Sequence, residues 1–574
     1  MRPLPFHDRI NKIVYFLERA GTKGIMNDEY ASGSESIGTN KDAKSKMLNG
    51  SAWMTVGSIT SRILGAVYII PWVTWFGAYS NQANALFAQG YNIYNIFVII
   101  ATAGLPSAIS KMVAHYNGLN EYGVSRRLYY SSMYVALAMG VICATVMTFA
   151  APKMANGDPN VVPVLHSLAW AVLIIPALAM SRGFLQGYNW MAPSAVSQFV
   201  EQVFRVIYML AATYLIMKIQ KGSWVSAVTQ STFAAFIGAL GAIAILAWAW
   251  LSHRQEMNSL INNGKNDLSV STGRLIIRMV YQAIPFVVIE SGVAIFMLID
   301  QFTFPKMLMS VGHFTHYQET VLYALFAFNA NKLFAIIISL ASAMAATVIP
   351  LLATARVQND FHGMRKQIEN VLLLFYFVMI PASLGLAAVA QQVYTVFYRY
   401  DHAGVVVLEF AAFVSIPMGL YTVAAAMMQG ISENRRMMRY LAIGIVIKLV
   451  LQYPCIMFAQ GLGPLLATCL SMFVIDYLIL HSFNMEFNLH FYQMSKPTNQ
   501  ILCFSLIMFA VTKVVMVLLG HLVSPYGRFT AFFMAVIGIA VGVGVFTFLA
   551  LKYRLADQII GPRSASLRRK LHIA

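Results

Sequence analysis

The residues best suited to chemistry in this chain are charged side chains that interrupt long apolar runs. A charge inside a membrane span is costly, so such residues face a protein interior or a water-filled cavity and often mark a transport pathway. The charged residues inside apolar runs are Arg62, Glu201, Arg205, Glu290, Asp300, Lys332, Lys448, Asp476 and Lys513.

Three of these charges are predicted to be structural. Glu201 precedes Arg205 by four residues, the order and spacing that favour an ion pair within one helix. Such a pair would hold its span against neighbouring helices and would not contact the substrate directly. Lys448 is also assigned a structural role. It lies within about 13 Å of Arg439 at the membrane edge, so snorkelling of its ammonium to the interface is an alternative.

Arg62 and Lys332 are the candidates for binding a substrate. Neither has a close acidic neighbour in its own helix, and an unpaired cation near the midplane needs water or an anionic ligand. Two such cations in one cavity suit a phosphate group. Glu290 and Asp300 are assigned either to coupling with a cation or to an ion pair across the cavity. No catalytic residue is expected.

The composition indicates a membrane protein with many spans. The hydrophobic fraction is 59% and the charged fraction 11%, less than half the charge density of a soluble domain. No phosphate-binding glycine loop, dinucleotide fingerprint or nucleophile elbow is present, so we predict no enzyme. His313 and His316 lack clustered acidic partners, so neither a metal site nor a cofactor is predicted.

Apolar runs of spanning length predict an all-α protein with about fourteen transmembrane helices. The predicted organisation is two six-helix lobes, two further spans and polar segments between and around them. The boundaries are a cytoplasmic tail at 1–50, a first lobe at 51–253, a cytoplasmic linker at 254–278, a second lobe at 279–484, two spans within 500–552 and a basic cytoplasmic tail at 553–574.

The distribution of Lys and Arg among the loops predicts the orientation. Most basic residues fall in the tails and in every second loop, while the opposite side holds only Lys153, Lys218, Lys221, Lys306, Arg399 and Arg528. Both termini are therefore expected to be cytoplasmic. Membrane topology accounts for the formal charge of +18, so no nucleic-acid partner is predicted.

An internal repeat relates the two lobes. Gln186-Gly187 corresponds to Gln429-Gly430 at an offset of 243, and Arg205 corresponds to Lys448 at the same offset. Each Gln-Gly pair precedes the fifth span of its set of six, and each cation lies within that span. Parallel repeats predict a cargo site between the lobes near the midplane.

Several motifs resemble those of the multidrug/oligosaccharidyl-lipid/polysaccharide flippase superfamily. The most specific stretch runs from Arg182-Gly183-Phe184-Leu185-Gln186-Gly187 through Pro193-Ser194 to Arg205-Val206. Ser61-Arg62-Ile63-Leu64-Gly65 and Ala330-Asn331-Lys332-Leu333 resemble cavity motifs of that superfamily. The chain looks most like the branch that holds lipid II flippases and Gram-positive polysaccharide export proteins.

This resemblance implies a V of two lobes around a central cavity, with the last two spans edging a groove for a lipid tail. It implies a bacterial plasma-membrane flippase for an undecaprenyl-pyrophosphate-linked glycan, working by alternating access. The expected partners are the lipid-linked glycan, membrane lipids and proteins of cell-wall synthesis. Membrane potential and a gradient of Na+ or H+ remain alternative driving forces. A drug/cation antiporter of the same superfamily is the alternative function.

Overall fold

The computed structural model describes residues 64–265, 272–358, 360–560 and 568, apart from 66 and 103. The chain divides into two compact units, 1–52 and 53–574, and all described residues belong to the second. The expected cytoplasmic tail and the substrate candidate Arg62 lie outside the described residues. The bounds of the lobes and the cytoplasmic location of the termini remain predictions.

The described residues form helices and no strand, as the apolar runs predict, because a helix satisfies its own backbone hydrogen bonds in lipid. The first group is α3 (Ile69–Phe76), α4 (Ser80–Thr102), α5 (Leu105–Gly118), α6 (Tyr122–Met154), α7 (Val161–Gly187), α8 (Met191–Tyr214) and α9 (Trp224–Ser252). The second group is α11 (Thr272–Glu290), α12 (Gly292–Val311), α13 (His316–Ala324), α14 (Asn331–Val357), α15 (Phe361–Ala388), α16 (Ala390–Tyr398), α17 (His402–Gly430), α18 (Asn434–Ala459) and α19 (Gly463–Phe487). The last long helices are α20 (Phe491–Leu522) and α21 (Arg528–Lys552).

Short helices lie between these long ones or follow the last of them. They are η1 (Gly77–Tyr79), the π-helical turns η2 (Leu215–Ile219) and η3 (Leu325–Ala330), η4 (Gln460–Leu462), α10 (Arg254–Asn262) and α22 (Leu555–Ile560). The predicted linker 254–278 is thus partly helical: it contains α10, and α11 begins within it at Thr272.

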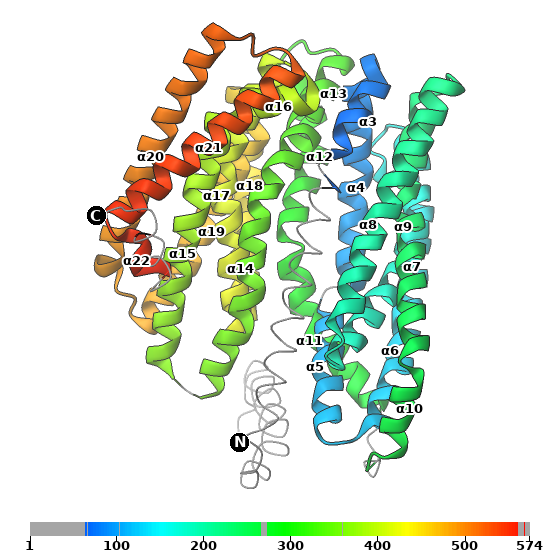
Figure 1. The fold of residues 1–574 in the computed structure, drawn as a ribbon. Coiled ribbons are helices and arrows are strands. Elements are labelled where there is room, and N and C mark those ends of the chain that lie inside the picture. The colour runs from blue at the N-terminus through cyan, green and yellow to red at the C-terminus, as the bar shows by residue number, and fades with distance from the viewer. Residues whose placement is uncertain are drawn as a thin grey trace, which may run out of the picture. The chain divides into compact units, whose positions relative to one another are not determined.

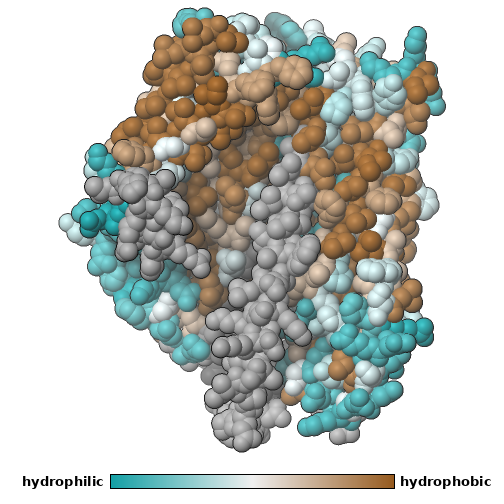
Figure 2. Space-filling view, viewed as in Figure 1, coloured by the Kyte–Doolittle hydropathy of each residue, from teal (hydrophilic) through white to brown (hydrophobic). Residues whose placement is uncertain are grey.

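Twelve helical segments within the described residues are long and apolar enough to cross a membrane. Some of these segments contain more than one of the helices above, among them Ile69–Gly118, His316–Ala353 and Asn434–Phe487. In Figure 2, apolar residues cover much of the visible face on both sides of the grey atoms, and hydrophilic residues gather at its lower end. The count of fourteen remains a prediction, because most of the first expected span lies outside the described residues.

The helices pack as two pseudo-symmetric lobes with two added helices (Figure 1). In the first lobe, α4, α5 and α9 pack on α7, α6 packs on α7, and α8 packs on α9. In the second lobe, α14, α15, α17 and α19 pack together and α18 packs on α19. The added α20 packs on α15, while α21 packs on α20 and α16.

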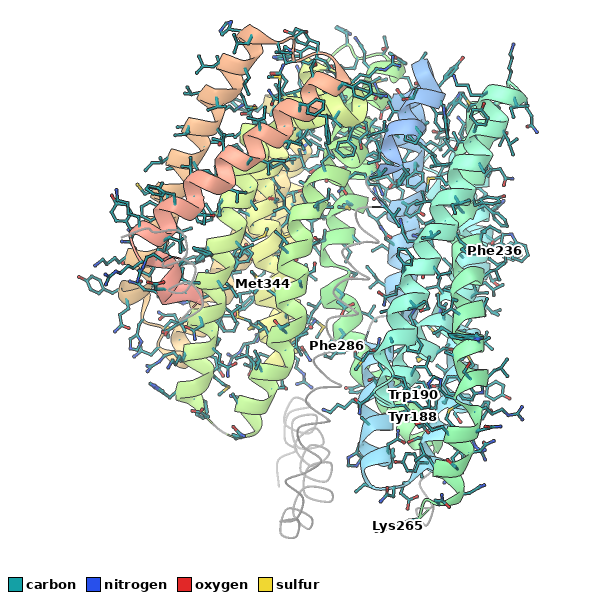
Figure 3. All side chains as sticks on the ribbon, in the orientation of Figure 1. Tyr188, Trp190, Phe236, Lys265, Phe286 and Met344 are labelled. Atoms are coloured by element: carbon teal, nitrogen blue, oxygen red, sulfur yellow. The ribbon has the colours of Figure 1, made fainter. Side chains whose placement is uncertain are left out.

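The seventh predicted span is broken and lies between the lobes. Its first half, α11, contacts α5 and α6 of the first lobe and α18 of the second, and its second half, α12, contacts α4 of the first lobe and α18 of the second. Phe286 of α11, labelled in Figure 3, packs on Gly104, whose φ of +72° is a backbone conformation that residues with a side chain rarely adopt. The Tyr421 hydroxyl donates to the Ile289 carbonyl at the break, over 2.8 Å, and so satisfies a carbonyl near the helix end.

The two Gln-Gly turns have the same backbone geometry, as the repeat predicts. Helix α7 ends at Gly187 and α8 begins at Met191; α17 ends at Gly430 and α18 begins at Asn434. The backbone amide of Asn189 donates to the Gln186 carbonyl, and that of Ser432 donates to the Gln429 carbonyl. Both donor residues, Asn189 and Ser432, have positive φ. The offset of 243 therefore relates matching helix–turn–helix units. In Figure 3, Tyr188 and Trp190 mark the first of these turns.

Candidate functional site

A cavity of about 400 Å³ contains both Lys332 and Arg205. We call it the cation cavity. Its walls come from both lobes: α4 and α8 from the first, and α14 from the second. The lining residues are Gly65, Tyr68, Phe87, Tyr91, Gln202, Arg205, Met209, Lys332, Ala335, Ile336, Ile338, Ser339 and Ser342.

Lys332 lies at the start of α14, directly after the π-helical turn η3. Such turns inside a helix redirect the side chains that follow and are frequent at functional sites. The Lys332 Nζ lies 5.4 Å from the ring centre of Phe87, 5.7 Å from that of Tyr91 and 5.5 Å from that of Phe328. Aromatic faces attract a cation without neutralising it, and Lys332 forms no ion pair with any described residue. Its positive charge is therefore available to a ligand.

Arg205 belongs to a chain of three charges at the edge of the same cavity. The Glu201 carboxylate accepts from Arg205 Nη2 over 2.9 Å and from Arg182 Nη2 over 2.8 Å. The side chains of Glu201 and Arg205 are 16% and 19% exposed. The predicted ion pair is present, but it has a second arginine. The Nε of Arg205 is buried and has no hydrogen-bond partner among the described residues.

The structure adds two features to this segment. Helix α7 continues to Gly187, so Arg182 of the family-like motif lies within a helix. There it also donates from Nε to the Ser197 hydroxyl over 2.9 Å. Arg205 was assigned a structural role, out of contact with the substrate; it forms the predicted ion pair with Glu201 and also lines the cation cavity, so contact with a cargo is a proposal. The short turn between α7 and α8 makes them antiparallel neighbours, which is the sequence signal that could have paired Arg182 with Glu201.

The cation cavity carries positive charge and no carboxylate among its lining residues. Glu201 is shared by two arginines, so that cluster keeps one net positive charge beside Lys332. Gln202, Ser339 and Ser342 add neutral hydrogen-bonding groups. This arrangement suits an anion with several oxygens, such as a phosphate or pyrophosphate.

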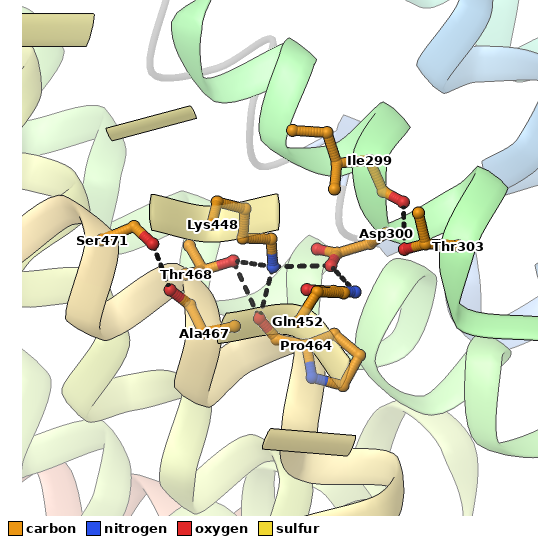
Figure 4. Close-up of polar contacts among 9 residues, drawn as sticks. All are labelled: Ile299, Asp300, Thr303, Lys448, Gln452, Pro464, Ala467, Thr468 and Ser471. Carbon is orange, nitrogen blue, oxygen red and sulfur yellow. Dashed lines mark hydrogen bonds and ion pairs between the residues drawn. The ribbon is translucent and has the colours of Figure 1, made fainter. Parts of the chain in front are cut away.

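Lys448 is enclosed in a cage of oxygen atoms in the second lobe (Figure 4). Its Nζ donates to Asp300 Oδ1 over 2.6 Å, to the Pro464 carbonyl over 2.7 Å and to the Thr468 hydroxyl over 2.8 Å. The Asp300 Oδ1 also accepts from Gln452 Nε2 over 2.8 Å. These contacts join α12, α18 and α19.

The cage settles two alternatives for these residues. The Lys448 side chain is 0% exposed, so its ammonium does not snorkel to the membrane edge. Asp300 was grouped with Glu290 as a coupling or cavity pair, but its ion-pair partner is Lys448. Opposite charges and hydrogen bonds at this depth offset each other's loss of hydration.

Glu290 ends α11, at the break before α12, and is exposed. It forms no ion pair with Lys332 or with any other described residue. Its predicted pairing with Arg62 lies outside the described residues. No group of three or more His, Cys, Asp or Glu side chains that could hold a metal occurs in the described part of the chain.

An apolar groove of about 440 Å³ lies next to the cation cavity. It is lined by residues of α14, α15, α16, α20 and α21, including Gly538 and Gly542. Ile336 of α14 lines both the groove and the cation cavity. A ligand with an anionic head and a long apolar tail could therefore occupy both spaces at once.

A buried polar chain joins the lobes at the end where α3 and α4 meet. Trp72 Nε1 donates to Asn84 Oδ1 over 2.8 Å, and Asn84 Nδ2 donates to Asn329 Oδ1 over 2.8 Å. Asn329 Nδ2 in turn donates to the Tyr394 hydroxyl over 2.9 Å. Asn329 lies in η3, only three residues before Lys332. This series of hydrogen bonds therefore connects the contact between the two lobes to the segment that positions Lys332.

Comparison with known proteins gives relatives over nearly the whole chain. Residues 47–356 match the family model described as "Polysaccharide biosynthesis protein". The chain is 33% identical over 545 residues to the lipid II flippase MurJ of Bacillus subtilis, covering 92% of this chain and 99% of that protein. It is 25% identical over 178 residues to the stage V sporulation protein B of B. subtilis, covering 30% of this chain and 34% of that protein.

Solved structures share the fold. A lipid II flippase MurJ in an inward closed conformation aligns with a TM-score of 0.58 at 14% identity, covering 87% of this chain and 98% of that chain. A MATE transporter in complex with MaD3S aligns with a TM-score of 0.56 at 14% identity, covering 77% and 96%. With the family match and the long flippase relative, these likenesses establish that the chain belongs to the polysaccharide biosynthesis protein family, within the multidrug/oligosaccharidyl-lipid/polysaccharide flippase superfamily.

Proposed function

We propose that this protein is a flippase that moves an undecaprenyl-pyrophosphate-linked cell-wall precursor, lipid II or a polysaccharide repeat unit, across the bacterial plasma membrane. The observation that carries the proposal is the cation cavity, where Lys332 and Arg205 face a shared space without a carboxylate among its lining residues. A pyrophosphate offers several oxygens to such cations. A relative that is 33% identical over 92% of this chain is a lipid II flippase.

The apolar groove supports a lipid-linked cargo. Its lining by α20 and α21 gives the two added helices a role, since a polyprenyl tail could lie along them in contact with lipid. Ile336 marks the point where the groove meets the cation cavity. The head group would cross between the lobes while the tail stays in an apolar environment.

Transport would proceed by alternating access of the two lobes. Opening at the end where α3 and α4 meet requires the Asn84–Asn329 hydrogen bond between the lobes to break. The break between α11 and α12 gives the span that contacts both lobes a point at which it can bend. The negative charge of the cargo favours membrane potential as the driving force, worth about 2.3 kcal/mol per charge for each 100 mV. A gradient of Na+ or H+ acting through exposed Glu290 is the alternative.

The remaining functional expectations are part of the same proposal. Both termini are proposed to be cytoplasmic, which places the loop at 155–160 and the α12–α13 connection outside. Arg62 is proposed to contact the cargo together with Lys332. Cell-wall synthesis proteins are proposed as partners that deliver or use the lipid-linked glycan.

A drug/cation antiporter is the second candidate, because MATE transporters share the fold. The two cations that line the cavity disfavour a cationic drug through like-charge repulsion. Purified protein in proteoliposomes should move a labelled lipid-linked glycan and should not export ethidium. Ethidium export without glycan movement would select the antiporter instead.

A further inference from the structure

A second polar cavity, of about 520 Å³, lies between the lobes on another face of α4. Leu86 and Gln89 line it, whereas Phe87 and Tyr91 line the cation cavity. We call it the acidic cavity. The first lobe contributes α4 and the 155–160 loop, and the second contributes α12 and α13.

The acidic cavity has the opposite charge from the cation cavity. Asp158 of the first lobe and Glu319 of the second both line it, and they are close enough to interact electrostatically. Glu319 is only 4% exposed. No lysine or arginine is among the lining residues. His316 Nδ1 lies 3.1 Å from Glu319 Oε2, but the His316 side chain is 82% exposed at the rim.

Unpaired acceptors face the same space. Gln301 is 4% exposed, and its Oε1 has no hydrogen-bond partner among the described residues. Its Nε2 donates to the Gln89 carbonyl over 3.2 Å, which fixes which amide atom is the oxygen. Gln82 Oε1 also lines the cavity without a described partner. A buried amide oxygen without a donor is costly, so these groups call for a ligand that donates hydrogen bonds.

The size and the aromatic residues narrow the class of ligand. Trp224 and Tyr317 line the cavity, and aromatic faces attract cations. A volume of about 520 Å³ falls in the range of small-molecule sites. It greatly exceeds what one bare metal ion would fill. A small organic cation would meet the carboxylates, the amide oxygens and the aromatic faces together.

We infer that the acidic cavity binds an organic ammonium group through Asp158, Glu319 and the Gln301 amide oxygen. Such a ligand offers N–H donors to the unpaired acceptors and a positive charge to the two carboxylates. The site is assembled from both lobes, so the ligand stabilises the arrangement in which these lobes meet. Bound ammonium therefore slows separation of the lobes at this end.

Thermal unfolding of the purified full chain tests the site without any transport assay. Ethanolamine hydrochloride should raise the Tm by roughly 1–2 °C at about ten times its Kd, relative to sodium chloride of equal ionic strength. The Asp158→Asn/Glu319→Gln variant should lose this shift. Glu256→Gln, which removes one exposed acid from the distant α10, should keep it.

A single variant tests whether loss of the Tm shift in the double variant is caused by a folding defect. Asp158 lies in a loop, so Asp158→Asn alone should fold normally and raise the apparent Kd for ethanolamine about tenfold. Equal shifts with ethanolamine and sodium chloride in the unaltered protein would overturn the inference. An undiminished shift in the double variant would overturn it as well.

Two further experiments distinguish a lipid head group from a peptide amine as the source of the ammonium group. Protein in nanodiscs with phosphatidylethanolamine should be more stable than in phosphatidylglycerol alone if the ligand is a lipid head group. Stabilisation by N-acetyl-lysine amide in detergent would instead indicate a peptide amine. Either result supports the inference, and both should disappear in the double variant. Because these experiments measure ligand binding and not transport, a negative result would overturn the ammonium site without bearing on the proposed flippase activity.

Discussion

Arg205 and Lys448 occupy equivalent positions in the two lobes but have opposite surroundings. Both lie fourteen residues into helices that follow the same Gln-Gly turn. The Arg205 side chain is 19% exposed and lines the cation cavity, whereas the Lys448 side chain is 0% exposed and is held by Asp300, Pro464 and Thr468. The repeat therefore predicts the position of the cation in each lobe, and the residues around the cation determine whether a ligand can reach it.

This difference indicates a division of labour between the lobes. The first lobe keeps an excess of positive charge, because Glu201 is shared between two arginines. The second lobe neutralises its cation with one carboxylate and closes the site with neutral oxygens. We expect the first cluster to act in transport and the second to act in stability.

The strongest test of the second cluster is to remove one partner. Lys448→Met leaves the Asp300 carboxylate buried and unpaired, which should cost about 3–5 kcal/mol of unfolding free energy. Replacing both, as Asp300→Leu/Lys448→Met, should recover most of this loss because no uncompensated charge remains. Denaturant unfolding in detergent measures both variants. Equal destabilisation by the single and double changes would contradict a structural pair.

Lys332→Met should affect transport rather than stability. Loss of a charge-assisted contact worth about 1.5–3 kcal/mol predicts a fall in flipping of about 10- to 100-fold. Lys332→Arg should retain most activity, because it keeps the charge beside Phe87 and Tyr91. Flipping of labelled lipid-linked glycan in proteoliposomes gives the rates. Unchanged flipping by Lys332→Met would remove this residue from the cargo site.

The two arginines on Glu201 should differ in effect. Arg205→Gln removes a cation from the cavity wall and should lower flipping about tenfold. Arg182 is not a lining residue, and Glu201 keeps Arg205 when Arg182 is changed. Arg182→Gln should therefore reduce flipping only about two- to threefold. The same reconstituted assay ranks them, and a larger effect of Arg182→Gln would refute the assignment of Arg205 to the cavity.

The apolar groove should give the smallest effect. Gly542 lines the groove, so Gly542→Leu should partly block a lipid tail and slow flipping by about two- to fivefold. Gly544 lies on the same helix with open space around it and outside the groove lining, which makes Gly544→Leu a matched control. Similar rates for the two variants would argue against a tail in this groove.

Much of the fold follows from local pattern. Apolar runs predict the long helices, and the Gln-Gly offset predicts two turns that prove to have the same hydrogen bonds. Lys332 stands out in sequence as a cation without a nearby acid, and it does line the cavity. These features depend on neighbours within one helix or on a regular repeat.

Contacts between residues far apart in the sequence could not be predicted from the sequence. Asp300 and Lys448 are 148 residues apart, and nothing in either helix marks the other as its partner. The location of Arg205 on the cavity wall depends on how α8 is placed relative to α4 and α14, which line the same cavity, and helical spacing within α8 does not reveal this. Local pairing with Glu201 is compatible with both a structural and a cargo-binding role.

The most direct test of the account compares flipping by Lys332→Met with flipping by Asp300→Leu/Lys448→Met in the same vesicles. We predict that the double variant stays within about threefold of the unaltered protein, while Lys332→Met falls at least about tenfold. The reverse order, with Lys332→Met active and the double variant inactive, would contradict the assignment of cargo binding to the cation cavity.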